Sequence, residues 1–232
     1  MSTAGAIILS RMDSRRLPGK ALVPVRGRPL VDYVLGRCRR LQAVGRNIIL
    51  ATSDRAVDDP LAAFARVNSV SVFRGSADDV AGRVLGCARH FGFDYFVRVN
   101  GDSPLIEPPL IDRAVRTAVD GRLDLVTNLL PRSFPYGVSA EVVRTAAFAD
   151  AYARMERPEH REHVTKYLYE HVDRFTYVNI SCPEGDLSRV RMTVDTTDDL
   201  DWFGGLVDRF GPAIDDLTYT DALPFCSHDG AV

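Results

Sequence analysis

The feature that most constrains the fold is the alternation of short apolar runs with amphipathic segments through the first half of this 232-residue chain. Four runs have the length of buried strands, and each is bounded by polar or turn-forming residues. They span residues 6–9, 47–52, 70–73 and 95–100. Apolar residues between them recur at helical spacing, as in residues 31–41 and 80–91. This order predicts an α/β fold with a parallel sheet and right-handed crossovers.

The second half of the chain is less regular but continues the mixture of strands and helices. The pattern predicts strands at residues 125–127, 141–143, 176–180 and 190–194, and helices at 146–155, 161–171 and 198–210. No internal repeat, low-complexity tract or linker interrupts the sequence. We therefore expect a single domain over residues 1–232, with a frayed tail from about residue 226.

Composition and charge argue against several classes of protein. The formal net charge is −2, so the chain lacks the basic field of a nucleic-acid-binding protein. A hydrophobic content of 46% is ordinary for a globular protein, and no apolar run approaches the roughly 20 residues of a membrane helix. The first apolar run is too short for a signal peptide. Four scattered cysteines without a C-x-x-C pair favour a reduced, cytoplasmic protein.

A basic loop directly follows the first predicted strand. It carries Arg11, Arg16 and Lys20 together with turn-forming residues such as Gly19. Ligands of open α/β sheets bind at the carboxyl ends of the strands, where backbone N–H groups and fixed cations suit anions. The loop matches neither G-x-x-x-x-G-K-[ST] nor G-x-G-x-x-G, so it predicts a polyphosphate site of another kind. The alternative interpretation is a solvated basic turn.

Two aspartates complete the expected site. Asp102 follows the fourth predicted strand in an Asn-Gly-Asp-Ser-Pro turn, and Asp195 follows the strand predicted at 190–194. If both strands end at the edge that holds the basic loop, the two carboxylates face the polyphosphate. Because Mg²⁺ is held by one or two carboxylates together with substrate phosphates, the pair predicts a magnesium site. Alternatively, Asp102 is an ordinary turn residue and Asp195 is a polar residue before a helix.

Two other polar groups have simpler interpretations. Thr196 and Asp199 form a T-x-x-D helix start, in which acidic residues are stabilised by the helix dipole. His160 and His163 lie one helical turn apart, but their order is not H-E-x-x-H and no third zinc ligand is apparent. Without a zinc site, a solvated helix start is one interpretation of this segment.

Several motifs, in order along nearly the whole chain, carry a family resemblance. They are RMDSRRLPGKAL, ATSDRAVDDPLA, VFRGSADDVAGR, VRVNGDSPLIEPPLID, REHVTKYLYEH and MTVDTTDDL. The first is similar to the R-x-x-S-x-R-L-P-G-K signature of sugar nucleotidyltransferases. Together the motifs resemble the cytidylyltransferases of the spore coat polysaccharide biosynthesis protein F type. That group is similar to the CMP-sialate and CMP-ketodeoxyoctonate synthetases.

The resemblance implies a fold, an assembly and a set of site residues. It implies a homodimer and a GT-A-like Rossmann-type nucleotidyltransferase fold, three-layered with a mostly parallel mixed sheet. The implied nucleotide-binding residues are Arg11, Ser14, Arg16, Gly19, Lys20 and Asn100, and the implied catalytic residues are Lys20, Arg11 and Asp102. Asp102 and Asp195 would bind Mg²⁺, and Tyr136, Ser139, Glu141, Arg161 and His163 would contact the acceptor.

The chain departs from the family pattern in two places. Asp13 and Arg15 stand where relatives often carry Gly and Thr, which adds one charge of each sign to the phosphate loop. Ser139 replaces the aspartate of a motif that relatives often read as G-L-D-V-E. The second change bears on contacts with the acceptor.

The expected reaction is transfer of CMP from CTP to an anionic acceptor, with release of pyrophosphate. The acceptor would be a sugar acid or a metabolite that carries a phosphonate or phosphate. One rival is a metal-dependent GT-A glycosyltransferase, but Asn100-Gly101-Asp102 lacks the first acid of an Asp-x-Asp motif. A second rival is a non-catalytic nucleotide-binding relative, and the presence of Lys20, Asp102 and Asp195 together argues against it.

Overall fold

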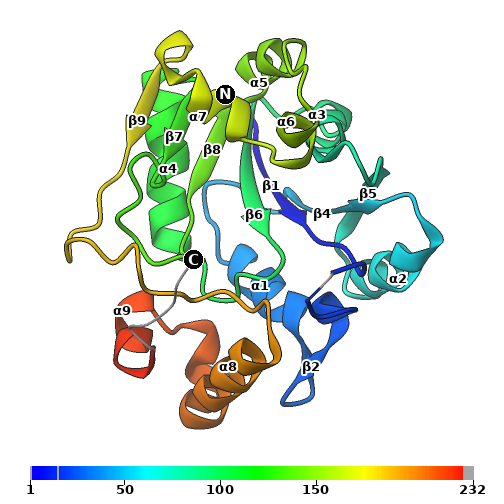
Figure 1. Cartoon of the computed structure of the whole chain (residues 1–232), viewed down its shortest axis with the longest axis vertical. Helices are drawn as coiled ribbons and strands as arrows, with labels where there is room; N and C mark the ends of the chain where they lie inside the picture. Colours follow the sequence, from blue (N-terminus) through cyan, green and yellow to red (C-terminus); the bar gives the residue numbers. More distant parts are fainter. Residues whose placement is uncertain (1, 15, 227–232) are drawn as a thin grey trace.

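A mixed β-sheet forms the centre of the protein in the computed structural model, which describes residues 2–14 and 16–226 (Figure 1). Among these residues the sheet has seven strands. They are β1 (Ala4–Leu9), β4 (Ile48–Ser53), β5 (Ser71–Gly75), β6 (Tyr95–Asn100), β7 (Leu125–Thr127), β8 (Glu141–Arg144) and β9 (Tyr177–Asn179). Their order across the sheet is β5-β4-β1-β6-β8-β7-β9, with β5 and β9 at the two edges (Figure 1). A separate antiparallel pair consists of β2 (Pro24–Val25) and β3 (Arg28–Pro29).

The strands of this sheet pair in parallel except where β8 is involved. β1 pairs with both β4 and β6, and Leu9 at its end lies beside Asn100. The carboxyl ends of β1, β4 and β6 therefore share one edge of the sheet. The antiparallel β8 begins at that edge, where Glu141 pairs with Arg98 of β6. The mostly parallel mixed sheet that the family resemblance implies is confirmed.

Helices cover both faces of the sheet, which confirms the expected three layers. The first face is packed by α1 (Leu30–Cys38), α2 (Asp59–Val67), α4 (Pro108–Gly121), α8 (Thr197–Phe210) and α9 (Tyr219–Ala222). The second face is packed by α3 (Val80–His90), α5 (Thr145–Tyr152) and α7 (Lys166–Glu170), with α6 (Pro158–Glu162) beside α3. Across residues 2–14 and 16–226, no helix has the length and apolar character needed to cross a membrane.

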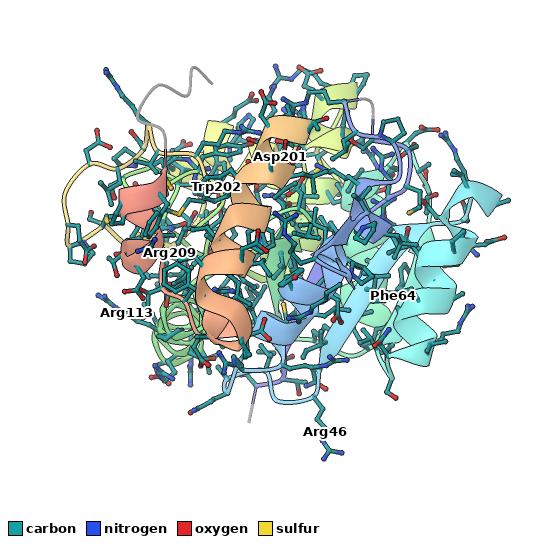
Figure 2. All side chains as sticks on the ribbon, turned by 90° about the horizontal axis from the view of Figure 1, so that it is seen from below. Arg46, Phe64, Arg113, Asp201, Trp202 and Arg209 are labelled. Atoms are coloured by element: carbon teal, nitrogen blue, oxygen red, sulfur yellow. The ribbon has the colours of Figure 1, made fainter. Side chains whose placement is uncertain are left out.

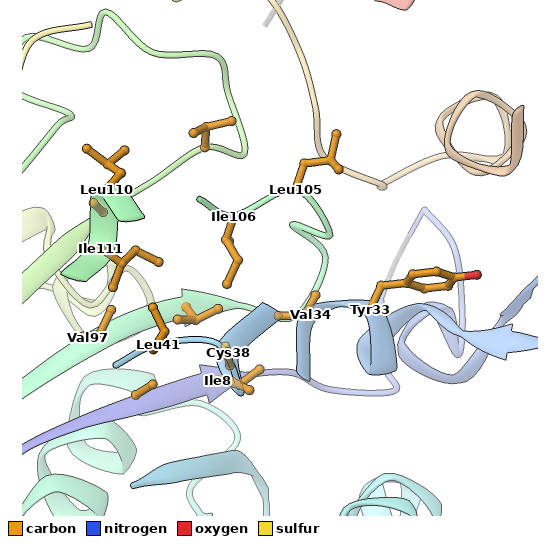
Figure 3. Packing of buried hydrophobic residues seen from close by; sticks show 14 of the residues in the cluster. Ile8, Tyr33, Val34, Cys38, Leu41, Val97, Leu105, Ile106, Leu110 and Ile111 are labelled. Atoms are coloured by element: carbon orange, nitrogen blue, oxygen red, sulfur yellow. The ribbon is translucent and has the colours of Figure 1, made fainter. Parts of the chain in front are cut away.

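The core of the first face joins neighbouring strands to α1 and α4. Ile8 of β1 and Val97 of β6 are fully buried, in one cluster with Val34 of α1 and Ile111 of α4 (Figure 3). Because both faces of the sheet are covered, the central strands are apolar along most of their length. Full burial of one such side chain stabilises the fold by about 1.5–3 kcal/mol. This packing fixes the strands whose ends carry the basic loop and Asp102.

The start of α8 lies directly after Asp195 and is firmly held. Thr196 and Asp199 form the expected capping box, in which the backbone N–H of each residue donates to the side-chain oxygen of the other. Farther along the helix, the Trp202 indole N–H donates to the carbonyl oxygen of Phe225 at 2.8 Å. Figure 2 shows Trp202 on α8 as seen from below. These contacts fix the position of the backbone at Asp195.

The prediction of a strand at residues 190–194 is wrong. The segment is extended, but its backbone bonds to loops rather than to a strand. It makes hydrogen bonds of 2.7 Å with Tyr136, and the Val194 N–H donates to the carbonyl oxygen of Asp102 at 2.9 Å. Because these partners belong to two different loops, no continuous ladder forms. Asp195 therefore follows an extended loop segment, which nevertheless brings it next to Asp102.

The helix predicted at residues 161–171 is divided into α6 and α7. His163, between them, has non-helical backbone angles of φ −103° and ψ 89°. The next two residues are buried, and the Thr165 hydroxyl donates to the buried carboxylate of Glu141 at 2.7 Å. Helical periodicity contains no information about this tertiary contact, so the break was not visible in the sequence.

Of the tail expected from about residue 226, the structure describes Cys226 alone. Cys226 is 8% exposed, and its thiol lies 3.4 Å from the carbonyl oxygen of Ala222. Residues 227–232 lie outside the described residues, and so does Arg15.

Asp124 is expected to make the stability of the fold depend on pH. Its carboxylate accepts hydrogen bonds from the backbone and hydroxyl of Thr176 and from Arg144, and so joins the segments around β7, β8 and β9. Burial raises the pKa of the Asp124 carboxyl, but these bonds outweigh it and hold the pKa below its ordinary value of 3.8. A depressed pKa contributes stability above that ordinary value, and the contribution is lost as pH falls through the folded-state pKa.

We therefore expect Asp124→Asn to lower the free energy of unfolding by about 2 kcal/mol at pH 7. The difference from wild type should shrink as the pH falls below about 3.8. Urea unfolding at a series of pH values measures it. A difference that stays constant between pH 7 and pH 3 would show that the carboxylate charge is not what stabilises these strands.

Candidate active site

The basic loop after β1 has a defined shape. A 2.8 Å hydrogen bond from the Gly19 N–H to the carbonyl oxygen of Met12 closes it. Gly19 has a φ of +73°, in the left-handed region that glycine adopts without strain, and it turns the chain into Lys20. The buried carboxylate of Asp58 accepts a 2.7 Å hydrogen bond from the Met12 N–H and so holds the first part of the loop in place. These contacts help to position Lys20.

The loops that follow β1 and β6 touch each other. The Gly101 N–H donates to the carbonyl oxygen of Leu9 at 2.9 Å. A Cβ atom at residue 101 would lie 2.7 Å from the Cβ of Ser10, a distance that real side chains essentially never show. Glycine therefore permits the close approach that places Asp102 beside the basic loop, as the parallel arrangement of the strands predicted.

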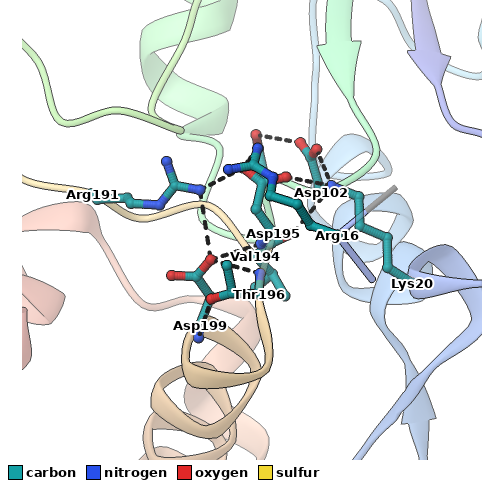
Figure 4. A network of polar contacts seen from close by, with 9 residues as sticks. Arg16, Lys20, Asp102, Arg191, Val194, Asp195, Thr196 and Asp199 are labelled. Atoms are coloured by element: carbon teal, nitrogen blue, oxygen red, sulfur yellow. Dashed lines mark hydrogen bonds and ion pairs between the residues drawn. The ribbon is translucent and has the colours of Figure 1, made fainter. Parts of the chain in front are cut away.

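Lys20 joins the two predicted metal ligands (Figure 4). Its Nζ lies 2.6 Å from Oδ2 of Asp102 and 2.6 Å from Oδ1 of Asp195, and it also donates to the carbonyl oxygen of Val194 at 3.3 Å. Burial lowers the pKa of Lys20, but the two carboxylates outweigh it and raise the pKa above its usual value. Three segments far apart in the sequence therefore meet at one ammonium group.

Asp195 also forms ion pairs with two arginines. Its Oδ2 lies 2.5 Å from Nη2 of Arg191 and 3.2 Å from Nη2 of Arg16 (Figure 4). Burial raises the pKa of the Asp195 carboxyl, but Lys20 and the two arginines outweigh it and lower the pKa. Asp195 is therefore a carboxylate at neutral pH, and it is more heavily paired with cations than Asp102.

A cleft of about 750 Å³ opens beside this cluster. Its lining contains predicted nucleotide-binding and catalytic residues, namely Arg11, Ser14, Arg16, Lys20, Asn100 and Asp102, together with His163. Among the described lining residues, six are Arg or Lys and four are Asp or Glu: Arg11, Arg16, Lys20, Arg55, Arg83 and Arg98 against Asp13, Asp78, Asp102 and Glu162. This excess of cations suits an anionic ligand.

Comparison with known proteins identifies the family. The family model described as cytidylyltransferase matches residues 5–200. The chain belongs to the cytidylyltransferase family. It is 31% identical over 211 residues to the spore coat polysaccharide biosynthesis protein SpsF of Bacillus subtilis, covering 88% of this chain and 86% of that protein. It is 35% identical over 130 residues to the 3-deoxy-manno-octulosonate cytidylyltransferase of Aeromonas salmonicida, covering 54% of this chain and 49% of that protein.

A solved structure supports the same assignment. A cytidylyltransferase from Leptospira borgpetersenii matches with a TM-score of 0.90 and 30% sequence identity. The match covers 97% of this chain and 93% of that chain. The GT-A-like Rossmann-type nucleotidyltransferase fold and the cytidylyltransferase class expected from the sequence motifs are therefore confirmed.

Two of the residues predicted to contact the acceptor of this cytidylyltransferase have clear roles within the protein. Arg161 donates to Asp79 at 3.1 Å and lies over the Tyr152 ring at 4.1 Å, so it ties α6 to the start of α3. Tyr136 lies in the second-half loop, where its ring contacts the guanidinium groups of Arg132 and Arg191 at 4.9 Å and 5.4 Å. Tyr136 thus contacts two arginines, of which Arg191 also pairs with Asp195.

Glu141 and Ser139 differ in accessibility. The Glu141 carboxylate is 1% exposed and accepts hydrogen bonds from Arg98, Thr165 and Tyr169. Burial raises the pKa of the Glu141 carboxyl, but these three donors outweigh burial and lower the pKa. Ser139 is half-buried nearby, two residues before Glu141. Neither lies among the described residues that line the cleft.

Sequence reasoning missed Arg98 and Asp58. A signal for Arg98 was present, because YFVRVN is an apolar strand in which Arg98 and Asn100 alternate with valines and so point to one face. Asp58 gave no such signal, since an acid before a Pro-containing helix start is ordinary. Its contact with Met12 joins segments 46 residues apart.

Proposed function

We propose that this cytidylyltransferase transfers CMP from CTP to an anionic acceptor and releases pyrophosphate. The observation that carries the proposal is the contact of Lys20 with both Asp102 and Asp195, since Lys20 and Asp102 line the cationic cleft. This arrangement places a cation and two carboxylates where the basic loop would hold a triphosphate. The family assignment supports CTP as the nucleotide.

The reaction forms a bond between an acceptor oxygen and the α-phosphorus while the bond to the β-phosphate oxygen breaks. Catalysis of such a transfer consists mostly of positioning and charge stabilisation. Arg11 and Arg16 line the cleft and would bind the triphosphate. Lys20 would donate to the oxygens of the departing pyrophosphate, where negative charge develops. No protein nucleophile is needed, because the acceptor attacks directly.

The residues fit a divalent cation. Asp102, Asp195 and the carbonyl oxygen of Val194 already converge on one cation, the Lys20 ammonium. Within the described part of the chain, no group of three or more His, Cys, Asp or Glu side chains forms a complete metal cage. A pair of carboxylates suits Mg²⁺, which takes its other ligands from water and substrate phosphates. When bound, Mg²⁺ would neutralise charge on the phosphates.

The acceptor class, the cell compartment and the assembly are parts of the same proposal. The relative from Aeromonas salmonicida is named for 3-deoxy-manno-octulosonate, a sugar acid, and the relative from Bacillus subtilis for polysaccharide biosynthesis. We infer a sugar acid acceptor in a carbohydrate pathway. Free, buried cysteines and the use of CTP favour the cytoplasm. The homodimer stays a prediction, which light scattering at several protein concentrations checks.

A pyrophosphate-release screen tests the proposal. The enzyme is incubated with Mg²⁺, each of the four nucleoside triphosphates and each of three acceptor classes: sugar acids, sugar phosphates and phosphonates. We expect release only with CTP and at least one anionic acceptor, and loss of release when EDTA removes the metal. Turnover of a sugar nucleotide without pyrophosphate release would support the glycosyltransferase rival. Binding of CTP with no turnover across the panel would support the non-catalytic rival.

A further inference from the structure

Arg98 extends the cleft floor beyond the predicted nucleotide site. It lies on β6 two residues before Asn100, so both side chains project from the same face of the sheet. Both line the cleft. Arg98 is therefore on the strand that ends at Asn100, just before the turn that holds Asp102, but it is farther from the basic loop and beside β8.

Glu141 fixes the orientation of Arg98. The two residues are direct cross-strand partners, and Nη1 of Arg98 donates to Oε2 of Glu141. The other carboxylate oxygen accepts from Thr165 at 2.7 Å and from Tyr169 at 2.5 Å. Both oxygens of the Glu141 carboxylate therefore accept hydrogen bonds from the protein. The carboxylate holds Arg98 in place and is not available to bind a ligand.

The rest of the Arg98 guanidinium has no hydrogen-bond partner among residues 2–14 and 16–226. Its Nε is buried and lacks a hydrogen bond, and the described residues supply no acceptor to Nη2. A buried donor without an acceptor costs about 1–3 kcal/mol. The Arg98 side chain is 21% exposed and lines the cleft, so a molecule in the cleft can accept a hydrogen bond from Nη2, while Nε stays buried.

A second guanidinium lies close to this pair. Arg132 makes a single long contact within the described residues, 3.5 Å to the carbonyl oxygen of Pro135, and stacks on Tyr136. Its pKa is lowered chiefly by burial, with Arg98 contributing and Glu141 opposing. Arg132 thus leaves a net positive charge beside the neutral Arg98–Glu141 pair.

We propose that the outer end of the Arg98 guanidinium, at Nη2, binds a carboxylate of the acceptor. This subsite rests on the function proposed above and assigns the residue that would recognise the carboxylate of a sugar acid acceptor. The planar fork of arginine matches the two oxygens of a carboxylate. A phosphate dianion would bring two negative charges next to Glu141, whereas a carboxylate brings one. Arg98 would then hold the acceptor with its reacting oxygen directed at the α-phosphorus, on the side opposite the departing pyrophosphate.

Binding measurements test the subsite separately from turnover. The enzyme is loaded with Mg²⁺ and cytidine 5′-(α,β-methylene)triphosphate, which cannot release pyrophosphate. Isothermal titration then measures Kd for 3-deoxy-manno-octulosonate and other sugar acids, each compared with its amide. We expect at least one acid to bind wild type about tenfold or more tightly than its amide, since a charged bidentate contact is lost in the amide.

Two variants separate recognition from folding. Arg98→Lys keeps the charge beside Glu141 but loses the fork, so the preference for acid over amide should fall about tenfold. The double variant Arg98→Met with Glu141→Gln leaves no unpaired buried charge and should lose the preference as well. Arg144→Lys is the control, because Arg144 pairs with Asp124 at the opposite end of β8 and lies outside the described cleft lining. It should retain the wild-type preference.

Each outcome of these measurements either supports or overturns the proposed carboxylate subsite. If no sugar acid binds the loaded enzyme, or if Arg98→Lys keeps the acid preference, the subsite is overturned. Pyrophosphate release with a phosphate-bearing acceptor alone would also overturn it, while the proposed CMP transfer would stand. Acid binding that depends on Arg98, in an enzyme that never releases pyrophosphate, would support the subsite and contradict the proposed function.

Discussion

Asp102→Asn and Asp195→Asn are each expected to lower turnover by a factor on the order of 10² or more. Both substitutions keep the size of the side chain and remove one negative charge from the pair that converges on Lys20. The remaining single carboxylate would hold a divalent cation much less strongly. EDTA should abolish the residual activity, and added Mg²⁺ should restore it only at higher concentration than in wild type.

The two variants should differ in stability. Among the described residues, Asp195 pairs with Lys20, Arg16 and Arg191, whereas Asp102 pairs with Lys20. Removing the Asp195 charge leaves more positive charge uncompensated, so Asp195→Asn should lower Tm more than Asp102→Asn. Thermal unfolding without metal or nucleotide measures this order.

Steady-state pyrophosphate release at saturating CTP measures the effect on turnover. Asp198→Asn is the control, because it removes an acid from the first turn of α8, three residues after Asp195. It should leave turnover close to that of wild type. Full activity in Asp102→Asn or Asp195→Asn would remove that residue from the mechanism.

The sequence was sufficient to predict the half of the site that local patterns and strand direction determine. β1 and β6 are short apolar runs followed by polar loops, and parallel strands must end at the same edge. The meeting of the basic loop with Asp102 follows from these facts. The Gly19 turn and the capping box at Thr196 were also readable, because each depends on residues close in sequence.

The remaining features depend on contacts between distant segments. The extended stretch before Asp195 has the alternation of a strand, yet it bonds to loops at Tyr136 and Asp102. The break before α7 is set by Thr165 binding Glu141. Periodicity in a single sequence shows which face of a segment is apolar. It does not show which distant backbone group or carboxylate will form hydrogen bonds with that segment. The alternation in β6 did mark Arg98, but its partner Glu141, 43 residues away, was not visible in the sequence.

Lys20→Met is expected to have two opposite effects on this enzyme. Turnover should fall by a factor on the order of 10², because the departing pyrophosphate loses a cation that binds it most strongly as charge develops. Nucleotide-free binding of Mn²⁺, used as a spectroscopic probe for Mg²⁺, should instead become about tenfold tighter or more. The Lys20 ammonium occupies the space between Asp102 and Asp195, so its removal leaves both carboxylates without that cation.

Lys166→Met is the matched control for Lys20→Met, because Lys166 is the other lysine of the sequence and its Nζ lies 3.9 Å from Glu170, away from the cleft lining. Electron paramagnetic resonance of free Mn²⁺ measures binding with and without CTP. In wild type, CTP should strengthen Mn²⁺ binding, since its phosphates attract Lys20 away from the carboxylates and add ligands. In Lys20→Met this strengthening should be smaller, because no ammonium has to be displaced.

If Lys20→Met binds nucleotide-free Mn²⁺ no better than wild type or Lys166→Met, then Lys20 does not compete with the metal. Its effect on turnover would then come from contact with the phosphates alone.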